Sequence, residues 1–382
     1  MFPILVLGAG KIGSSIAKLL SRSGDFAVTI ADKDPVALDR LAASTPANML
    51  LLEIHNPGSL AREIRKVCQG APGERAGAVF SACSFDVNSI IAEAALEAGV
   101  SYFDLTEDVE TTRRIRALAA RSIEGQIFMP QCGLAPGFIG ILAAAMSRSF
   151  DKLESVQMRV GALPQYPHNH MKYNLTWSTD GVINEYCNPC EVIHQGRRME
   201  VLALEGLEHI SIDGLEYEAF NTSGGLGTLC ETLEGNVQEL NYKTMRYPGH
   251  QYLMDFLING LRLGQTLAYR QQLREILERA LPITRQDVVL TFCSVSGYKD
   301  GHFTQETDAR KIYHQTLEGE HWSSIQVTTA AGACAVVDLF REGKLPPQGF
   351  VRQEDVMLDD FLANRFGAHY AIGSEHVKAV HP

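Results

Sequence analysis

A glycine-rich turn near the start of the chain is the feature that most constrains its fold. Gly8, Gly10 and Gly13 form the spacing G-x-G-x-x-G between a short apolar run, residues 4–7, and a segment whose apolar residues repeat at helical spacing. The first glycine permits a tight turn, the second lets a pyrophosphate approach the backbone, and the third lets the helix pack closely on the strand. The start of a helix also favours an anion. This pattern predicts a strand–turn–helix unit that binds a dinucleotide.

A carboxylate follows at the position that such a unit needs. A second apolar run, residues 27–31, ends at Asp32, about twenty residues after the glycines, where an acid accepts hydrogen bonds from the ribose hydroxyls. Asp32 would repel a 2′-phosphate, and Lys33 would weaken that repulsion. We therefore expect NAD as the cofactor, with NADP possible.

The alternation of strands and helices continues beyond this unit. We predict strands at residues 48–54, 77–83, 100–105 and 125–133, with helices at 57–67 and 86–99. Such alternation is typical of a Rossmann-type, doubly wound parallel sheet, which binds ligands at the carboxyl ends of its strands. The residues expected to contact the cofactor are Gly8, Gly10, Lys11, Ile12, Gly13, Asp32, Lys33, Ser81, Ala82, Cys83, Asp104 and Gly133.

The pattern changes after residue 138, where the helix 139–150 leaves the first domain. Alternating segments predict antiparallel strands at 154–164, 189–204 and 209–222, with turns at Gly196 and Gly214. Helices are expected at 250–263, 270–281 and 330–343, and strands at 288–296 and 322–329. The fold class is therefore α/β, a Rossmann domain (1–137) plus an α+β substrate and dimerisation domain (138–330). A helical segment (331–382) is expected to return to the first domain.

Composition narrows the range of partners. With 382 residues, 45% hydrophobic and 21% charged, the chain is long enough for two globular domains. Its net charge of −11 disfavours nucleic acid and anionic membranes as partners. The apolar N-terminal segment reads as a first strand and not as a signal peptide, and no apolar run is long enough for a membrane span. Eight scattered cysteines suit a reducing cytoplasm.

Several blocks resemble a known family over nearly the whole chain. These are "GAGKIGSSIAKLL", "YFDLTED", "GLAPGF", "YNLTWSTDGVINEYCNPCEVIHQGRRMEV", "EAFNTSGGLGTL", "KTMRYPGH" and "AAGACAVVDLFREGKLPPQGFV". Together they resemble the saccharopine dehydrogenase family, and within it the lysine 6-dehydrogenase branch. The resemblance implies oxidation at a C–N bond with NAD(P), an amino acid as substrate, and a homodimer paired through the second domain. "CNPC" and "PHNHMK" depart from the family pattern.

Amine oxidation needs a group that takes a proton, a cation for the substrate carboxylate, and acids for its ammonium. Residues 173–186 and their neighbours combine these types, so we expect this segment to face the nicotinamide across the domain cleft. An ordinary strand and helix start in the subunit-pairing sheet is the alternative. The expected catalytic residues are His170, Lys172 and Tyr173. The expected substrate-binding residues are Trp177, Asp180, Glu185, Arg246 and His250, with Arg246 as the carboxylate clamp.

Other interpretations stay open at this point. Cys187 and Cys190, with His168 and His170, could supply four zinc ligands, but the tryptophan block separates the pairs and we expect no metal. Saccharopine could replace lysine as the substrate. The chain could also be a non-catalytic NAD(H)-binding redox sensor, or an opine-type reductase that joins an amine and a carbonyl.

Overall fold

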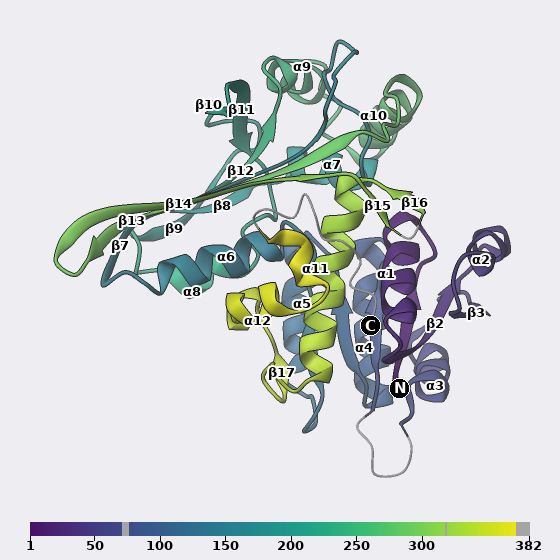
Figure 1. Ribbon diagram of the computed structural model, residues 1–382. Coiled ribbons are helices and arrows are strands. Elements are labelled where there is room, and N and C mark those ends of the chain that lie inside the picture. Colours follow the sequence, from purple (N-terminus) through teal and green to yellow (C-terminus); the bar gives the residue numbers. More distant parts are fainter. Residues whose placement is uncertain (71–75, 318, 372–382) are drawn as a thin grey trace. The chain divides into compact units, whose positions relative to one another are not determined.

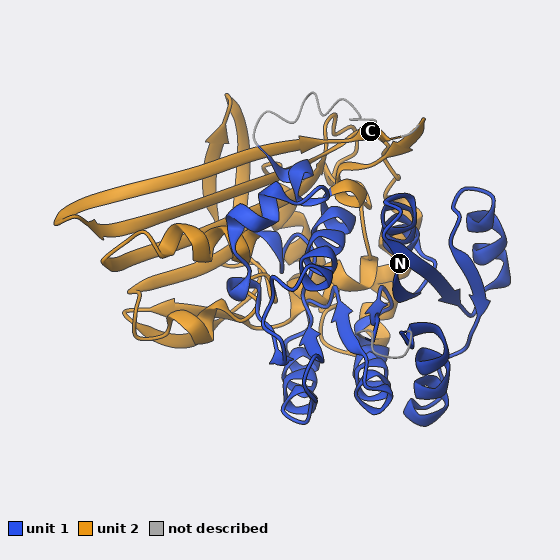
Figure 2. Ribbon diagram, turned by 60° about the horizontal axis from the view of Figure 1, so that its bottom comes forward, with its two compact units in different colours: residues 1–138, 328–382 blue, residues 139–327 orange. Residues whose placement is uncertain are grey.

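The chain forms two compact units. The computed structural model describes residues 1–70, 76–317 and 319–371 (Figure 1). Unit 1 combines residues 1–138 with 328–382, and unit 2 is formed by residues 139–327 (Figure 2). Unit 1 is therefore built from both ends of the chain, and unit 2 is inserted between them.

A seven-stranded parallel sheet forms the centre of unit 1. Its strand order is β17-β6-β5-β4-β1-β2-β3, so the order reverses at β1, and the predicted doubly wound Rossmann-type sheet is confirmed. The last strand in the sequence pairs in parallel with β6. The strands are β1 (Phe2–Leu7), β2 (Phe26–Asp32), β3 (Asn48–Leu51), β4 (Ala78–Ser81), β5 (Ser101–Asp104), β6 (Ile127–Met129) and β17 (Gly349–Phe350).

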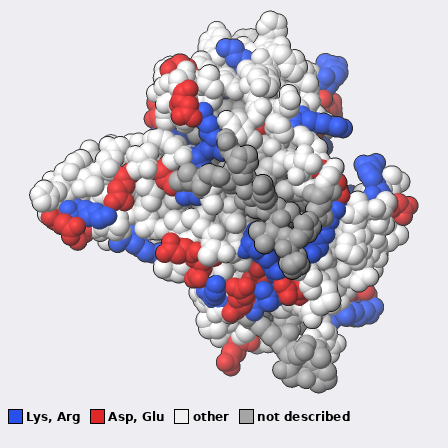
Figure 3. Space-filling model, in the orientation of Figure 1, with Lys and Arg blue, Asp and Glu red and all other residues white. Residues whose placement is uncertain are grey.

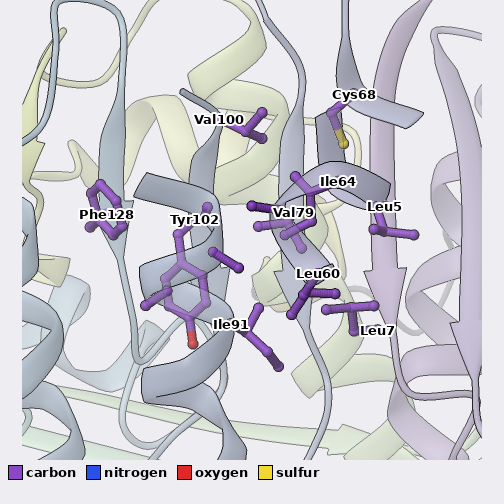
Figure 4. Packing of buried hydrophobic residues seen from close by; sticks show 14 of the residues in the cluster. Leu5, Leu7, Leu60, Ile64, Cys68, Val79, Ile91, Val100, Tyr102 and Phe128 are labelled. Carbon is purple, nitrogen blue, oxygen red and sulfur yellow. The ribbon is translucent and has the colours of Figure 1, made fainter. Parts of the chain in front are cut away.

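Helices cover both faces of this sheet. They are α1 (Lys11–Arg22), α2 (Pro35–Ala42), α3 (Pro57–Cys68), α4 (Phe85–Ala98), α5 (Val109–Ala119), α11 (Ser324–Arg341) and α12 (Leu358–Ala363), with the 3₁₀ turns η2 (Gln353–Asp355) and η3 (Gly367–Tyr370). On one face, Ile64 of α3 and Ile91 of α4 pack with Tyr102 of β5 (Figure 4). Side chains alternate along a strand, so Phe103 points to the opposite face, where Phe340 of α11 contacts it.

An eight-stranded mixed sheet forms the centre of unit 2. Its main order is β10-β11-β12-β7-β13-β14, and the β8–β9 hairpin joins at β12. The β12–β7 pair is parallel and the other pairs are antiparallel. The strands are β7 (Lys152–Pro164), β8 (Cys190–His194), β9 (Arg197–Val201), β10 (Glu208–Ile212), β11 (Leu215–Asn221), β12 (Glu239–Arg246), β13 (Asp287–Lys299) and β14 (His302–Tyr313). Strands β15 (Gln315–Leu317) and β16 (Glu320–Trp322) form a separate hairpin.

The helices of unit 2 create a second core against this sheet. They are α6 (Phe138–Ser147), α7 (Thr179–Cys187), α8 (Leu229–Leu233), α9 (His250–Asp255), the π-helical turn η1 (Phe256–Gly260) and α10 (Leu267–Ala280). Tyr186 of α7, Met254 of α9 and Leu273 of α10 are buried in one cluster with Phe220 of β11. The predicted α+β character of the second domain is confirmed.

The strand predicted at residues 322–329 is wrong. Only Trp322 of that segment lies in a strand, and helix α11 begins at Ser324. The β-branched residues of "WSSIQVTT" favoured a strand, but a distant side chain supplies the helix start. Fully buried Asp287 of β13 accepts hydrogen bonds from the backbone N–H groups of Ser324 (2.7 Å) and Ile325 (3.3 Å). A carboxylate at this position satisfies free N–H groups and complements the helix dipole.

Three described strands of unit 2 carry no prediction from the sequence. They are β12, β14 and β15, and β12 ends at Arg246, one of the expected site residues. Within the part of the chain that the structure describes, no helix has both the length and the apolar character needed to cross a membrane. On the face that Figure 3 shows, acidic and basic side chains lie side by side.

Candidate functional site

The glycine turn of unit 1 has the geometry of a dinucleotide-binding turn. Gly8 has a φ of +99°, which favours glycine. A Cβ on Gly13 would lie 1.9 Å from the Gly8 carbonyl oxygen, so only glycine allows α1 to approach β1 this closely. A Cβ on Gly10 would meet no described atom within 4 Å. The turn is thus tight where the chain must pack and open at the position that faces a pyrophosphate in such folds.

Helix α1 begins directly at this opening. Its N-cap is Gly10, and no side chain of the described residues caps it; its first turn also holds no acidic residue. The N–H groups at a helix start carry a partial positive charge and bind phosphate oxygens. The start of α1 therefore offers backbone donors to an anion.

Asp32 is held beside the turn by the backbone. One carboxylate oxygen accepts a hydrogen bond from the Ala9 N–H (2.6 Å) and the other from the Asp34 N–H (2.9 Å). A carboxylate can accept about four hydrogen bonds, so each oxygen retains capacity for a ribose hydroxyl. Lys33 is exposed next to it.

The other predicted cofactor residues of unit 1 differ in their exposure. Lys11 is exposed, whereas Ile12, Ala82 and Cys83 are half-buried; burial raises the pKa of the Cys83 thiol to about 11. The buried residues of this set are Ser81, Asp104 and Gly133. The Ser81 hydroxyl donates to Asn88 Oδ1 (2.7 Å), so its proton is already used in a hydrogen bond inside the fold.

Asp104 is a fully buried carboxylate at the end of β5. It accepts hydrogen bonds from the Tyr102 hydroxyl (2.7 Å), the Asn88 amide (3.2 Å) and the backbone N–H groups of Thr106 and Gln131. Burial raises the pKa of Asp104 to about 6, although these donors favour the ionised form. These contacts join β5 to helix α4 and to the loops that follow β5 and β6, so the side chain ties together the carboxyl ends of these two strands within unit 1.

A buried arginine marks the second site, which lies in unit 2. Arg246, the last residue of β12, is only 2% exposed. Its Nη1 donates to the Met245 carbonyl (2.8 Å), and its guanidinium carbon lies 4.8 Å from the ring centre of Tyr173 and 5.9 Å from that of Tyr186. Together with buried Glu185 and His250, these residues form what we call the arginine cluster.

The charges in the arginine cluster have clear causes. Burial lowers the pKa of Arg246, but the nearby Tyr186, Tyr173 and Glu185 outweigh burial, so its pKa lies above the usual arginine value. Burial raises the pKa of Tyr186 well above that of free tyrosine. Burial and then the charge of Arg246 lower the pKa of His250 to about 3. At neutral pH the cluster therefore holds a guanidinium cation, a protonated phenol and a neutral imidazole.

The structure brings together half of the residues expected to act on the substrate. Tyr173, Glu185, Arg246 and His250 meet in the arginine cluster. The remaining four are His170, Lys172, Trp177 and Asp180.

These four lie outside the cluster's buried interior. His170 and Lys172 are exposed, and Lys172 Nζ donates to the Pro248 carbonyl (3.1 Å). Asp180 is 54% exposed and forms an ion pair with Arg274 of α10 (3.0 Å). Half-buried Trp177 packs closely against Gly181 at the start of α7, where an added Cβ would lie 2.2 Å from a ring carbon. Their roles stay predictions.

Two tyrosines of the arginine cluster and its surroundings are not among the residues that the sequence singles out, although one of them, Tyr186, ends the predicted segment 173–186. Tyr186 contacts Arg246 and His250, and buried Tyr242 lies close enough to Glu185 and Arg246 for their charges to act on it. Tyr242 and Arg246 are separated by four residues on β12, so they share one face of that strand. Recognition of β12 as a strand would have pointed to Tyr242.

The "CNPC" segment has no metal-site geometry. The described residues contain no group of three or more His, Cys, Asp or Glu side chains arranged to hold a metal ion. Cys187 and Cys190 are both free thiols, and burial raises the pKa of Cys190 to about 12.

The glycine turn, the sheet order and the inserted second unit define a dinucleotide-binding protein with two units. Two family models cover nearly all of it: the saccharopine dehydrogenase NADP-binding domain matches residues 4–128, and the saccharopine dehydrogenase C-terminal domain matches residues 133–368. The chain belongs to the saccharopine dehydrogenase family. It is accordingly an oxidoreductase with a nicotinamide-cofactor domain, and the family resemblance of its sequence is confirmed.

Solved structures show the same fold. Apo saccharopine dehydrogenase (L-Glu forming) from Saccharomyces cerevisiae is similar with a TM-score of 0.72 and 15% identity, over 94% of this chain and 96% of that one. A homospermidine synthase from Legionella pneumophila in complex with NAD is similar with a TM-score of 0.65 and 13% identity, over 96% of this chain and 89% of that one. At these identities the likeness concerns the fold.

Proposed function

We propose that the chain is an NAD-preferring dehydrogenase that acts on the C–N bond of an amino acid, with lysine oxidised at its ε-carbon as the favoured case. One observation carries this proposal: a buried guanidinium, Arg246, lies beside a buried carboxylate, Glu185, in a unit joined to a dinucleotide-binding domain. An amino acid carries the complementary pair of charges. The Arg246 guanidinium would hold its carboxylate, and Glu185 would face its ammonium.

The protein's part in this reaction is binding and proton transfer. The nicotinamide cofactor would accept a hydride from the carbon that bears the nitrogen. A protein group must take a proton from that nitrogen, and water must then add to the resulting imine. We propose Lys172, His170 or Tyr173 for the proton transfer, and that residues 173–186 face the nicotinamide. Lys172 and His170 are exposed, so either could pass a proton on to solvent.

The number of available cations favours lysine over saccharopine. Saccharopine carries three carboxylates, and the cations in this part of the chain that could bind them are Lys172, Lys243 and Arg246. Lys243 Nζ is already engaged by Glu208 (2.7 Å) and by the Gly206 carbonyl. One buried guanidinium, with one exposed lysine, suits a single carboxylate better than three.

A second candidate is an opine-type reductase that joins an amine and a carbonyl. The fold likeness to a homospermidine synthase supports it. A polyamine substrate would have no group for Arg246, however, so a buried guanidinium favours substrates that carry a carboxylate. Oxidation of NADH in the presence of paired amino and keto compounds would reveal this activity.

The cofactor preference rests on Asp32. Its fixed carboxylate would lie beside the ribose hydroxyls and would repel the 2′-phosphate of NADP. We therefore propose NAD. We also propose that unit 2 pairs two copies of the chain, which light scattering would show as twice the mass of one chain.

Kinetics of the purified protein test this function. NAD or NADP reduction should be followed with L-lysine, saccharopine and cadaverine, which is lysine without its carboxylate. We expect lysine to give the highest kcat/KM, with NAD. Tight NADH binding without turnover of any of the three, in either direction, would support the redox-sensor alternative instead.

A further inference from the structure

Two buried hydrogen-bond donors lie together in the arginine cluster. Among the described residues, neither Arg246 Nε nor the Tyr173 hydroxyl has a hydrogen-bond partner, and the two residues are 2% and 1% exposed. The guanidinium lies over the face of the Tyr173 ring, so the side chains are in direct contact. Buried donors almost always have a partner. The pair therefore points to a ligand with acceptor oxygens, for which a carboxylate is suited.

A histidine fixes the surroundings of these donors. His250 is buried at the start of α9, with Nδ1 3.0 Å from the Met171 carbonyl oxygen and Nε2 3.2 Å from the Tyr186 hydroxyl. A carbonyl only accepts hydrogen bonds, so Nδ1 carries the proton. A neutral imidazole has no proton left for Nε2, so the Tyr186 hydroxyl must donate to it.

The groups that face His250 keep it neutral. Burial and then the Arg246 cation lower the pKa of His250, whereas the hydrogen bond to the Met171 carbonyl raises it. The rings of Tyr173, Tyr186 and Phe220 contact the imidazole. Burial raises the pKa of Tyr186, so its hydroxyl stays protonated at neutral pH. With its proton given to His250, the Tyr186 oxygen retains only lone pairs for the guanidinium.

His250 is thereby linked to both donors. The Tyr186 hydroxyl, which donates to His250, also contacts the guanidinium of Arg246. The Nη1 of that guanidinium donates in turn to the Met245 carbonyl. Through the Met171 carbonyl, His250 holds the backbone two residues before Tyr173. Asn169 fixes the same segment from the other side, because its amide donates to the Tyr173 carbonyl (2.8 Å).

We propose that His250 is a positioning residue for carboxylate recognition: as a neutral imidazole with its proton on Nδ1, it holds Arg246 and the Tyr173 hydroxyl as a pair of donors matched to one substrate carboxylate. This inference rests on the proposed function, because the carboxylate is that of the amino acid substrate. It assigns His250 no proton transfer, since both ring nitrogens are engaged inside the fold. It leaves the proton transfer to Lys172 or His170, because the Tyr173 hydroxyl binds the carboxylate.

Substrate pairs with and without a carboxylate test this role. The variants are His250→Asn, which can retain an N–H toward Met171 but not the contact with Tyr186, and Tyr186→Phe. Their matched controls are His209→Asn and Tyr252→Phe, at exposed positions. We expect both test variants to raise KM for L-lysine about tenfold to a hundredfold, which corresponds to about 1.4–2.8 kcal/mol. KM for cadaverine and for NAD should change less than about twofold.

A merely structural role gives a different result. If His250 only supports packing, the variant should weaken lysine and cadaverine equally, and that outcome would overturn the inference. An unchanged KM for lysine would overturn it too. Binding of lysine and cadaverine in the presence of NADH, measured by calorimetry, separates the inference from the proposed function. If the wild-type protein binds lysine more tightly than cadaverine, and this preference falls in His250→Asn although no turnover is seen, the inference is supported and the proposed function is refuted. If lysine is turned over and its preference over cadaverine is the same in His250→Asn, the proposed function is supported and the inference is refuted.

The protonation state of His250 is testable without any substrate. In the protein with ¹⁵N-labelled histidine rings, the His250 signals are assigned through the contacts of this ring with the rings of Tyr173, Tyr186 and Phe220. We expect the pattern of a neutral ring with its proton on Nδ1, constant between about pH 5 and 8. A ring that titrates in this range, or that carries its proton on Nε2, would overturn the inference even if the kinetic variants fail to fold.

Discussion

Replacing Arg246 by lysine should weaken carboxylate binding while the buried positive charge is kept. Lysine lacks the planar set of donors, so the hydrogen bond available from Arg246 Nε is lost. A hydrogen bond to a charged group contributes about 1.5–3 kcal/mol, which corresponds to roughly a 10- to 150-fold higher KM for an amino acid substrate. The value for cadaverine should stay nearly constant, because cadaverine has no carboxylate to lose.

Replacing Arg246 by methionine should affect stability as well. The variant removes the cation that faces the buried carboxylate of Glu185. Removal of one partner from a buried charge pair lowers the free energy of unfolding by about 3–5 kcal/mol. Urea unfolding of Arg246→Lys and Arg246→Met under the same conditions measures the difference in their free energies of unfolding. Steady-state kinetics of Arg246→Lys measures the loss of carboxylate binding as the rise in KM for the amino acid substrate. Two results together would refute this account of Arg246. The first is an equal fall in kcat/KM for the substrates L-lysine and cadaverine in Arg246→Lys, and the second is an equal free energy of unfolding for Arg246→Lys and Arg246→Met.

Three further predictions concern aspartates of both units. Asp32→Ala should narrow or invert the preference for NAD over NADP, and the ratio of the two kcat/KM values should change by a factor that corresponds to about 1–3 kcal/mol. If the wild-type protein uses both cofactors equally, Asp32 does not set the preference and the charge of Lys33 offsets it. Asp287→Ala should lower the free energy of unfolding by about 1–2 kcal/mol, because it removes the cap of α11, whereas the same change at exposed Asp34, the cap of α2, should cost less. Burial raises the pKa of Asp104 from 3.8 to about 6, so the folded state favours the protonated form. The free energy of unfolding should therefore fall by about 3 kcal/mol as pH rises from about 4 to 6, and then level off. Urea unfolding at several pH values should show this fall, and Asp104→Asn should remove it; an unchanged profile in the variant would assign the pH dependence to other groups.

The glycine turn was predictable because its chemistry is local. The spacing of Gly8, Gly10 and Gly13 and the position of Asp32 after a second apolar run specify one supersecondary unit within about thirty residues. The structure adds what the spacing cannot contain, such as the hydrogen bond from the Ala9 N–H to Asp32. The alternating strands of the first domain were predictable for the same reason, since each shows a continuous apolar run.

The second unit was less predictable because its decisive contacts join distant residues. Helix α11 starts where it does because Asp287, about forty residues earlier in the chain, accepts its first N–H groups. The sequence indicates Arg246 by its charge and by the "KTMRYPGH" block, but its pattern does not predict the strand that buries it beside Tyr242. Asp180 and Lys172 had suitable chemistry, but no sequence pattern distinguishes their exposed positions from the buried position of Glu185.

The insertion of unit 2 within unit 1 has a consequence for biosynthesis. Strand β17 must pair with β6, yet about 220 residues separate them, and α11 covers the same sheet from the same late part of the chain. On the ribosome, the first six strands emerge long before the seventh, so the sheet keeps an open edge and a partly uncovered face while the whole of unit 2 is made. Nascent chains that stop before α11 should therefore depend on chaperones, although every residue of the glycine turn is already present in them.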